Sequence, residues 1–438
     1  MKKPSRLSAG NGRPFFAVAG QRRCLWCWLA LFLFLAGCAS SPLKQARSDF
    51  YGGRPETAAL ALSDPSGVSK RDRLLYYMEK GVILHHTGQF EESIATLLDA
   101  AALIKEQDII SVTEQTGSLV TTEWITEYKG EYAERLLVHT YLMMGFLLTG
   151  RPESALVEAR QALEVFDRFP KATARDHFTR ALIAHCFEIN GEINGAYIEY
   201  RKLAKQMDDP GPVADKLVYL AARLGFFDDV EKWRQYLPGN DPEKVQLPGA
   251  HQGMTPMAGE LILFVSQGQA PQKVPRNIVL PPTIRFSFAT YRERTRSFYP
   301  PAVTIASRAG QPRTVTTNVG KVLNDSLESR LARILAKETA RVATKEVLAQ
   351  QIDDPLAQAL VRLAFFAMEE PDTRAWETLP AYMTLIRIPV DPGDHDLSVR
   401  TSGGTLRLPL LTVSPNRRFY HYSVRAGYEP AIPASVSP

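Results

Sequence analysis

The sequence has few cysteines and few histidines for its length. Of 438 residues, four are cysteine and eight are histidine, and three of the cysteines lie within the first 38 positions. Only Cys186 remains, so no disulfide can form within the rest of the chain. Its neighbours are apolar, and we expect it to be buried as a small apolar side chain. No two histidines have zinc-protease spacing, and adjacent His85 and His86 would point about 100° apart on a helix.

Catalytic signatures are also lacking. After residue 38 there is no phosphate-cradling glycine loop, no serine nucleophile elbow and no paired-cysteine metal knuckle. His395 lies among Asp391, Asp394 and Asp396, yet acidic residues around a proline-glycine turn are ordinary turn chemistry. We therefore predict no catalytic residue, no metal and no cofactor. A carboxylate pair that only the fold brings together would escape a motif search.

Acidic residues are absent from the beginning of the chain. Residues 1–23 contain six basic residues and no acidic one, and residues 24–36 form an uncharged apolar run. This layout is typical of a secretory signal peptide, and thirteen residues are fewer than the roughly 20 that a spanning helix needs. Loss of the six basic residues would change the formal charge from +5 to −1. The basic composition therefore gives no support to nucleic-acid binding.

Leu35-Ala36-Gly37-Cys38 directly follows the apolar run. These four residues resemble the lipobox of bacterial lipoproteins, whose cysteine is diacylated and becomes the first residue of the mature chain. The resemblance implies lipidation of Cys38, and Ala39 and Ser40 in place of aspartate imply the outer membrane. We expect the protein to face the periplasm, although these residues do not determine the side. Several acyl chains hold a protein stably, since each buried methylene contributes about 0.8 kcal/mol. The alternatives are an ordinary signal peptide with a chance cysteine and an uncleaved apolar anchor.

The next two hundred residues have a helical pattern with a recurring motif. In the clearest copy, large and small residues share one helix face, a glycine forms the turn, and a second apolar face follows. Three further copies follow, and the turn glycines Gly191 and Gly225 are 34 residues apart. The pattern resembles a tetratricopeptide repeat, in which helix hairpins stack into a solenoid with a concave binding surface. The alternative is an irregular helical bundle with glycine turns.

We predict that the concave surface holds a partner protein. An insertion between the two clearest repeats, residues 111–134, is both polar and aromatic, and such residues either contact partners or pack structurally. The candidate groove residues are Tyr77, Gly81, Leu84, Gly88, Phe90, Trp124, Tyr128, Tyr132, Phe146, Gly150 and Gly191.

The distal half changes character after prolines and glycines near residues 237–242. We predict strands at 261–265 and 284–288, a helix at 324–350 and a meander of strands from 382 to 425. A basic line along the helix is either a solvated face or a contact for an anionic partner, and its members are Arg330, Arg333, Lys337, Arg341 and Lys345. An apolar segment at 355–368 is too short to span a membrane and reads as a core helix.

These patterns predict an α+β protein: an N-terminal α-helical tetratricopeptide-like repeat solenoid, followed by a smaller α+β domain with antiparallel strands. The predicted boundaries are a lipoprotein signal peptide at 1–37, a tether at 38–49, a helical-repeat domain at 50–238, a linker at 239–259, an α+β domain at 260–428 and a flexible tail at 429–438.

Three segments carry a further resemblance. The stretches GEYAERLLVHTYLMM from Gly130, ESALVEARQALE from Glu153 and DTRAWETLP from Asp372 resemble an uncharacterised family of bacterial envelope lipoproteins with such repeats. The resemblance implies location and architecture, and no biochemical role. We hypothesise an envelope scaffold for outer-membrane or cell-wall assembly that binds the membrane through acylated Cys38, envelope proteins, and peptidoglycan. The alternatives are an envelope hydrolase of cell-wall or lipid substrates and a surface-exposed adhesin.

Overall fold

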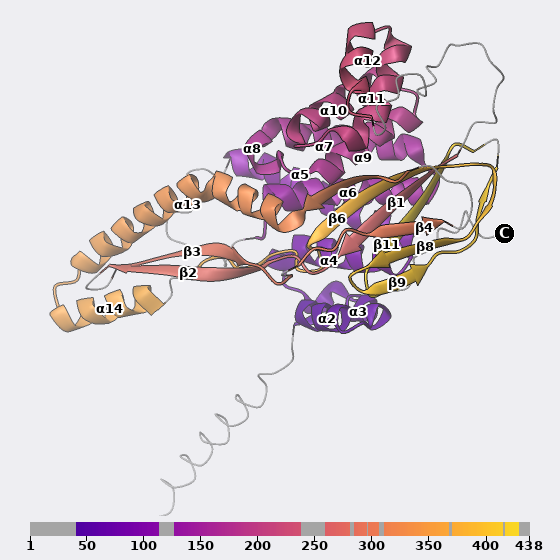
Figure 1. Ribbon diagram of the computed structural model, residues 1–438. Helices are drawn as coiled ribbons and strands as arrows, with labels where there is room; N and C mark the ends of the chain where they lie inside the picture. Colours follow the sequence, from indigo (N-terminus) through magenta and orange to yellow (C-terminus); the bar gives the residue numbers. More distant parts are fainter. Residues whose placement is uncertain are drawn as a thin grey trace, which may run out of the picture.

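The computed structural model shows a helical body with a projecting arm (Figure 1). It describes residues 41–113, 127–237, 259–280, 284–295, 297–305, 311–367, 370–414 and 417–428. The helices of the first half are α2 (Pro42–Tyr51), α3 (Pro55–Ala61), α4 (Arg73–His86), α5 (Phe90–Thr113), α6 (Tyr132–Leu148), α7 (Pro152–Arg168), α8 (Pro170–Thr173), α9 (His177–Ile189), α10 (Ile193–Gln206), α11 (Gly211–Leu224) and α12 (Phe227–Arg234), with 3-10 turns η1 (Pro65–Gly67) and η2 (Lys70–Asp72).

The helices form successive hairpins of the tetratricopeptide type. The pairs α4–α5, α6–α7, α9–α10 and α11–α12 are each joined by a short turn whose glycine has φ between 72° and 79°. That left-handed conformation strains other residues, which explains the glycine period. Within the first pair, Gly81 allows close packing, since a Cβ there would lie 2.5 Å from the Leu97 side chain. The predicted repeats are confirmed.

The predicted tether at 38–49 is wrong for most of its length. Helix α2 begins at Pro42, and Ser41 caps it by accepting a hydrogen bond from the Lys44 N–H. Helix α2 has an apolar face although its sequence is mostly polar, and Leu43, Ala46 and Phe50 on that face are buried in the core. Residues 38–40 lie outside the described residues.

The central sheet of the distal half has the order β11 (Phe419–Arg425), β1 (Gly259–Gln267), β6 (Tyr382–Val390), β5 (Arg313–Asn318). The contacts β1–β6 and β6–β5 are antiparallel, whereas β11 lies parallel to β1. The smaller strands are β4 (Ala302–Ile305), β7 (Gly393–His395), β8 (Leu397–Thr401), β9 (Gly404–Arg407) and β10 (Leu411–Val413). The predicted strands form, and β8 pairs with its sequence neighbour β9 as a meander requires. The rest of the meander is wrong, because β6 and β11 both pair with β1.

Both faces of this sheet are buried, in keeping with the nearly unbroken apolar sequence of β1. Ile262 and Phe264 belong to a core shared with the helices. Leu261 and Leu263 point the other way and pack with β8 and β10 in a second cluster. The sheet is thus a middle layer between helices and small strands, and the two halves predicted as separate domains share one apolar core.

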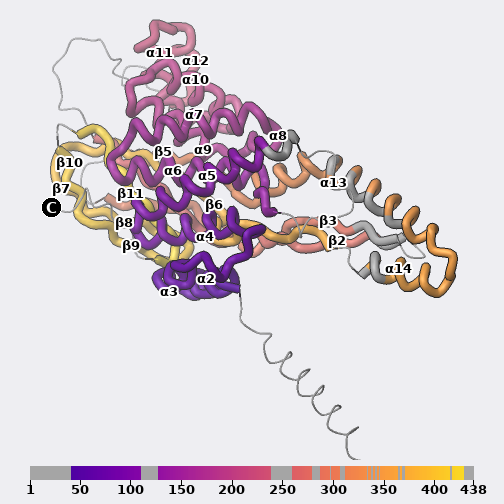
Figure 2. The backbone as a smooth tube through the Cα atoms, turned by 180° about the vertical axis from the view of Figure 1, so that it is seen from behind, coloured from indigo at the N-terminus to yellow at the C-terminus, as the bar shows by residue number. Residues whose placement is uncertain are grey.

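The arm consists of α13 (Val319–Gln350), α14 (Pro355–Ala367) and the hairpin of β2 (Gln272–Leu280) and β3 (Ile284–Arg292). It extends away from the body in both Figure 1 and Figure 2. The predicted helix at 355–368 forms as α14, but its predicted place in the core is wrong: Leu356, Leu360 and Leu363 are 71%, 58% and 62% exposed. Among the described helices, none has the length and apolarity that a membrane crossing requires.

Candidate functional site

The inner face of the solenoid is filled by the chain's own sheet. The first helices of the hairpins contact β5, β6 and β11. His85 Nε2 of α4 lies 3.0 Å from Ser423 Oγ of β11, and the Phe178 N–H of α9 donates to Thr317 Oγ1 of β5 at 2.7 Å. The surface that a free solenoid would offer to a partner is therefore occupied within this molecule.

The predicted groove residues consequently do not line an open groove. Leu84, Phe90, Tyr128, Phe146 and Gly81 are buried, and Tyr77 and Tyr132 are half-buried. The remaining described candidates, Gly88, Gly150 and Gly191, form the hairpin turns. Trp124 and Cys38 lie outside the described residues. Large and small apolar residues can pack the repeats against each other or contact a partner. The sequence pattern is the same in both cases, so it could not separate the two roles.

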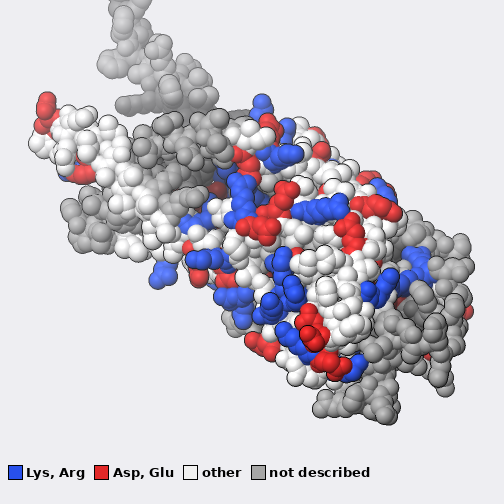
Figure 3. Space-filling model, turned by 90° about the horizontal axis from the view of Figure 1, so that it is seen from above, with Lys and Arg blue, Asp and Glu red and all other residues white. Residues whose placement is uncertain are grey.

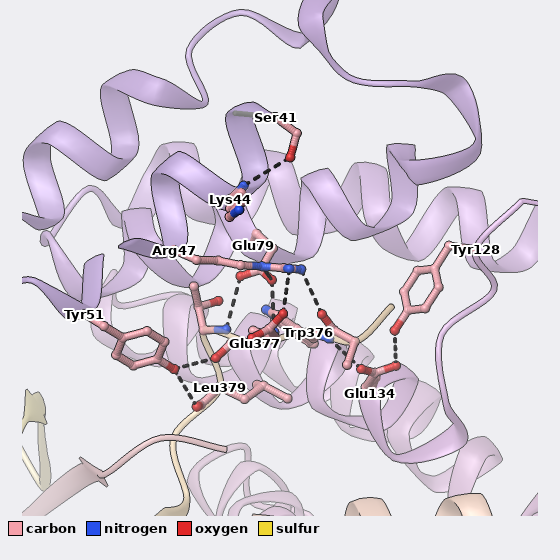
Figure 4. A network of polar contacts seen from close by, with 12 residues as sticks. Ser41, Lys44, Arg47, Tyr51, Glu79, Tyr128, Glu134, Trp376, Glu377 and Leu379 are labelled. Atoms are coloured by element: carbon pink, nitrogen blue, oxygen red, sulfur yellow. Dashed lines mark hydrogen bonds and ion pairs between the residues drawn. The ribbon is translucent and has the colours of Figure 1, made fainter. Parts of the chain in front are cut away.

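A segment from Asp372 to Pro380 clamps the two halves together (Figure 4). The fully buried Glu79 of α4 accepts hydrogen bonds from the backbone N–H groups of Glu377 and Thr378, at 2.9 and 3.1 Å. Arg47 of α2 bonds to both Glu79 and Glu377. The Trp376 N–H donates to Glu134 Oε1 at 2.8 Å. The carboxylates thus accept hydrogen bonds from backbone N–H groups, and such charge-assisted hydrogen bonds are strong.

A second carboxylate cluster joins helices α9 and α11 to strands β1 and β6. Lys216 of α11 lies 2.7 Å from Glu188 of α9 and 2.6 Å from Glu260 of β1, and Arg387 of β6 bonds to Glu260 and to Asp215. Burial acts to raise the pKa of Glu260, but these two cations outweigh it and lower the pKa to about 2.

The root of the arm is held by Glu131, just before α6. Its two carboxylate oxygens meet Lys273 of β2 and Arg330 of α13, each at 2.7 Å. Burial opposes ionisation of Glu131, yet the two cations lower its pKa to about 2. Arg330 belongs to the predicted basic line, so this member pairs with a carboxylate inside the molecule.

A pocket of about 580 Å³ opens where the hairpin turns at Gly150 and Gly191 approach the start of β11. Glu188, Arg418 and His421 line it. Both cationic neighbours of Glu188, Lys216 and Arg418, bond to its Oε1 atom. The Glu188 carboxylate is thus already engaged by two cations inside the protein.

His85, His185 and the Cys186 thiol belong to the interior. Burial lowers the pKa of His85 and of His185 to about 3, so both are neutral at pH 7. Burial also raises the pKa of Cys186, which is fully buried as expected. Within the described residues, no group of three or more histidine, cysteine, aspartate or glutamate side chains is placed to hold a metal ion. On the face seen in Figure 3, acidic and basic side chains are interspersed.

Sequence reasoning missed the carboxylates at the contacts between the halves. The available signal was a charged residue on an otherwise apolar helix face: Glu79 follows Leu75 by four residues and precedes Val82 by three, and all three are buried. Such a residue needs a partner from elsewhere in the fold. The sequence could have flagged Glu79, but it could not have named Arg47 and the 372–380 segment as its partners.

Comparisons with solved structures return helical-repeat proteins at low similarity. MamA from Desulfovibrio magneticus is 14% identical with a TM-score of 0.31, over 45% of this chain and 93% of that one. PilF of Pseudomonas aeruginosa is 15% identical with a TM-score of 0.31, over 44% and 72%. The TPR2AB domain of yeast Sti1, seen in complex with pHSP90, is 11% identical with a TM-score of 0.21, over 44% and 74%. No protein-family model and no curated protein matches the chain.

Likenesses of this strength carry no functional conclusion, so the class of the protein follows from its own geometry. It is a tetratricopeptide-like helical-repeat protein whose solenoid wraps an α+β region with largely antiparallel strands.

Proposed function

We propose that this protein is a lipid-anchored scaffold of the bacterial envelope that binds a partner protein through its arm. The lipobox-like Leu35–Cys38 supports the anchor, and the repeat architecture supports a role in protein interaction. The inner face of the solenoid is already occupied, so the partner site lies elsewhere.

The observation that carries the proposal is the apolar stripe on α14. Leu356, Leu360 and Leu363 have the i, i+4, i+7 spacing of one helix face, and all three are more than half exposed. Val347 and Leu348, near the end of α13, add exposed apolar surface at 56% and 40%. Scattered single apolar residues are normal on a protein surface, whereas a contiguous stripe marks an interaction site. An amphipathic helix presented in this way fits a hydrophobic groove of a partner.

The anchor places this stripe near the bilayer. Only residues 39–41 separate Cys38 from α2, and four residue steps of extended chain span at most about 14 Å. In Figures 1 and 2, which share a vertical axis, α2, α3 and the α14 end of the arm all lie toward the lower edge of the molecule. An acylated Cys38 would therefore hold the arm beside the membrane surface, where it would meet a membrane-associated partner.

Site-specific photo-crosslinking in the native cell tests the proposal. A photoreactive residue at Leu360 should yield a discrete crosslinked protein, and the same residue at Leu60 of α3, which is 73% exposed on the body, serves as the matched control. The double variant Leu356→Glu/Leu363→Glu should abolish the Leu360 product, and Cys38→Ser should reduce it by releasing the protein from the membrane. Identical products from positions 360 and 60 would refute the arm as the binding site. Unchanged membrane fractionation of Cys38→Ser would refute the anchor.

A further inference from the structure

The pocket at the start of β11 has a cationic lining that plays no part in the proposed contact of the arm with a partner. It lies on the body, between the turns of two helix hairpins and the first residues of the strand. Its charged lining consists of Arg223, Arg417 and Arg418 against one acid, Glu188, a formal charge of +2.

The single acid does not cancel this charge for an occupant, because it is already engaged. Arg418 Nη2 lies 2.8 Å from Glu188 Oε1, and Lys216 lies 2.7 Å from the same atom on the buried side. Arg223 is exposed and stacks over the Tyr219 ring, and Arg417 stacks over the Tyr420 ring. Arg223 Nη1 donates to Tyr219 Oη at 3.3 Å, and Arg417 Nε donates to the Phe419 carbonyl at 3.1 Å. Neither group is paired with a carboxylate in the described residues, so their remaining N–H groups are available to an anion.

A buried histidine adds a further donor. His421 is 4% exposed, lines the pocket, and faces His185 with their Nε2 atoms 2.9 Å apart. Both rings are neutral because burial lowers the pKa of each, so one Nε2–H donates to the other. His185 Nδ1 has no partner. A buried N–H without a partner is rarer than an acceptor without one, so His185 Nε2 is the donor.

This assignment determines the role of the second ring. His421 accepts at Nε2 and therefore carries its proton on Nδ1. Among the described residues, the hydrogen bond given for the His421 ring is the one at Nε2, and the ring lines the pocket while being 4% exposed. An occupant of the pocket can therefore accept a hydrogen bond from Nδ1–H.

Part of the pocket lining is apolar. Leu147, Ile189, Ile193 and Phe419 contribute to the lining. We propose that this pocket binds a ligand that carries an oxyanion, a carboxylate or a phosphate, on a short apolar body. The oxyanion lies among the arginines and His421, and the apolar body lies against Ile193 and its neighbours.

Titration calorimetry on the purified full-length protein tests the proposal with four probes: sodium octanoate, octyl phosphate, sodium acetate and inorganic phosphate. We expect saturable binding of the two octyl compounds, at least tenfold tighter than acetate and phosphate, since burial of several methylenes adds about 0.8 kcal/mol each. The tighter of the two octyl compounds identifies the head group. If octanoate bound no more tightly than acetate, and octyl phosphate no more tightly than phosphate, the proposed contact with an apolar body would be overturned. Absence of saturable binding by all four would overturn the proposal as a whole.

The arginine contribution has a matched control. Arg223 and Arg201 each stack on a tyrosine four residues earlier, Tyr219 and Tyr197, but only Arg223 lines the pocket. Arg223→Gln should weaken octanoate binding roughly tenfold, the size of one charge-assisted hydrogen bond, and Arg201→Gln should leave it unchanged. Equal effects of the two variants would mean an adventitious ion only.

A second variant separates loss of ligand binding from loss of folding. Ile193→Glu adds a negative charge at a half-buried position, leaves the arginines in place, and should abolish binding while the circular dichroism spectrum stays unchanged. Unaltered binding by this variant would overturn the proposed site. Because the pocket and the arm lie on different parts of the molecule, loss of ligand binding and loss of the Leu360 crosslink are separable results.

Discussion

Removal of the Glu79 carboxylate should loosen the contact between the two halves. Its oxygens accept hydrogen bonds from two backbone N–H groups of the 372–380 segment and from Arg47 Nε at 2.8 Å. In Glu79→Ala these donors lose the buried acceptor that joins them. A buried donor without a partner costs about 1–3 kcal/mol, so we expect a loss of about 4 kcal/mol in the free energy of unfolding.

Urea denaturation of the non-acylated Cys38→Ser form measures this loss. With an m value of about 4 kcal/mol per molar, above the range of small proteins, the midpoint should fall by about 1 M. Because one apolar core spans both halves, the transition should stay single. The control is Glu91→Ala, since Glu91 is 69% exposed and pairs with Arg151 on the surface, where an ion pair contributes at most about 1 kcal/mol. A Glu79→Ala midpoint no lower than that of Glu91→Ala would refute the clamp.

Three further predictions concern stability and reactivity. The pKa of Glu131 is lowered from 4.5 to about 2 in the folded protein, so its contribution is present above pH 4.5 and is lost as the pH falls toward 2; the urea midpoint of Glu131→Gln should therefore fall less between pH 6 and 3 than that of the parent. Gly81→Ala should cost about 1–3 kcal/mol in the same assay, because the new Cβ meets Leu97, and a midpoint equal to that of the parent would contradict the close helix approach. Cys186 should not react with a thiol reagent until urea unfolds the protein, since it is buried and its pKa is raised; rapid labelling of native protein would show that the α9 core opens.

Local patterns predicted the elements of this fold better than their assembly. Gly88, Gly150 and Gly191 indicated the hairpin turns, because a positive φ is a local property that glycine alone meets without strain. The order of the strands depends on which distant segments meet, and the parallel pairing of β11 with β1 joins residues more than 150 positions apart. No spacing in the sequence reports such a contact.

The candidate sites show the same division. The apolar segment at 355–368 was predicted as a helix, but the sequence could not show that Leu356, Leu360 and Leu363 lie exposed on an arm instead of in the core. Likewise, Arg223 and Arg417 are far apart in the chain, and only the approach of the hairpin turns to β11 brings them to one pocket.

The sheet occupies the inner face of the solenoid as a bound ligand would, and both belong to one polypeptide chain. Short flexible linkers give an attached ligand an effective concentration in the millimolar range. A free peptide would compete poorly for the inner helices against that concentration, whatever its sequence. The same reasoning implies that residues 41–237 and 259–428, produced as separate chains, would form a complex. Its dissociation constant would measure the affinity of the two segments for each other.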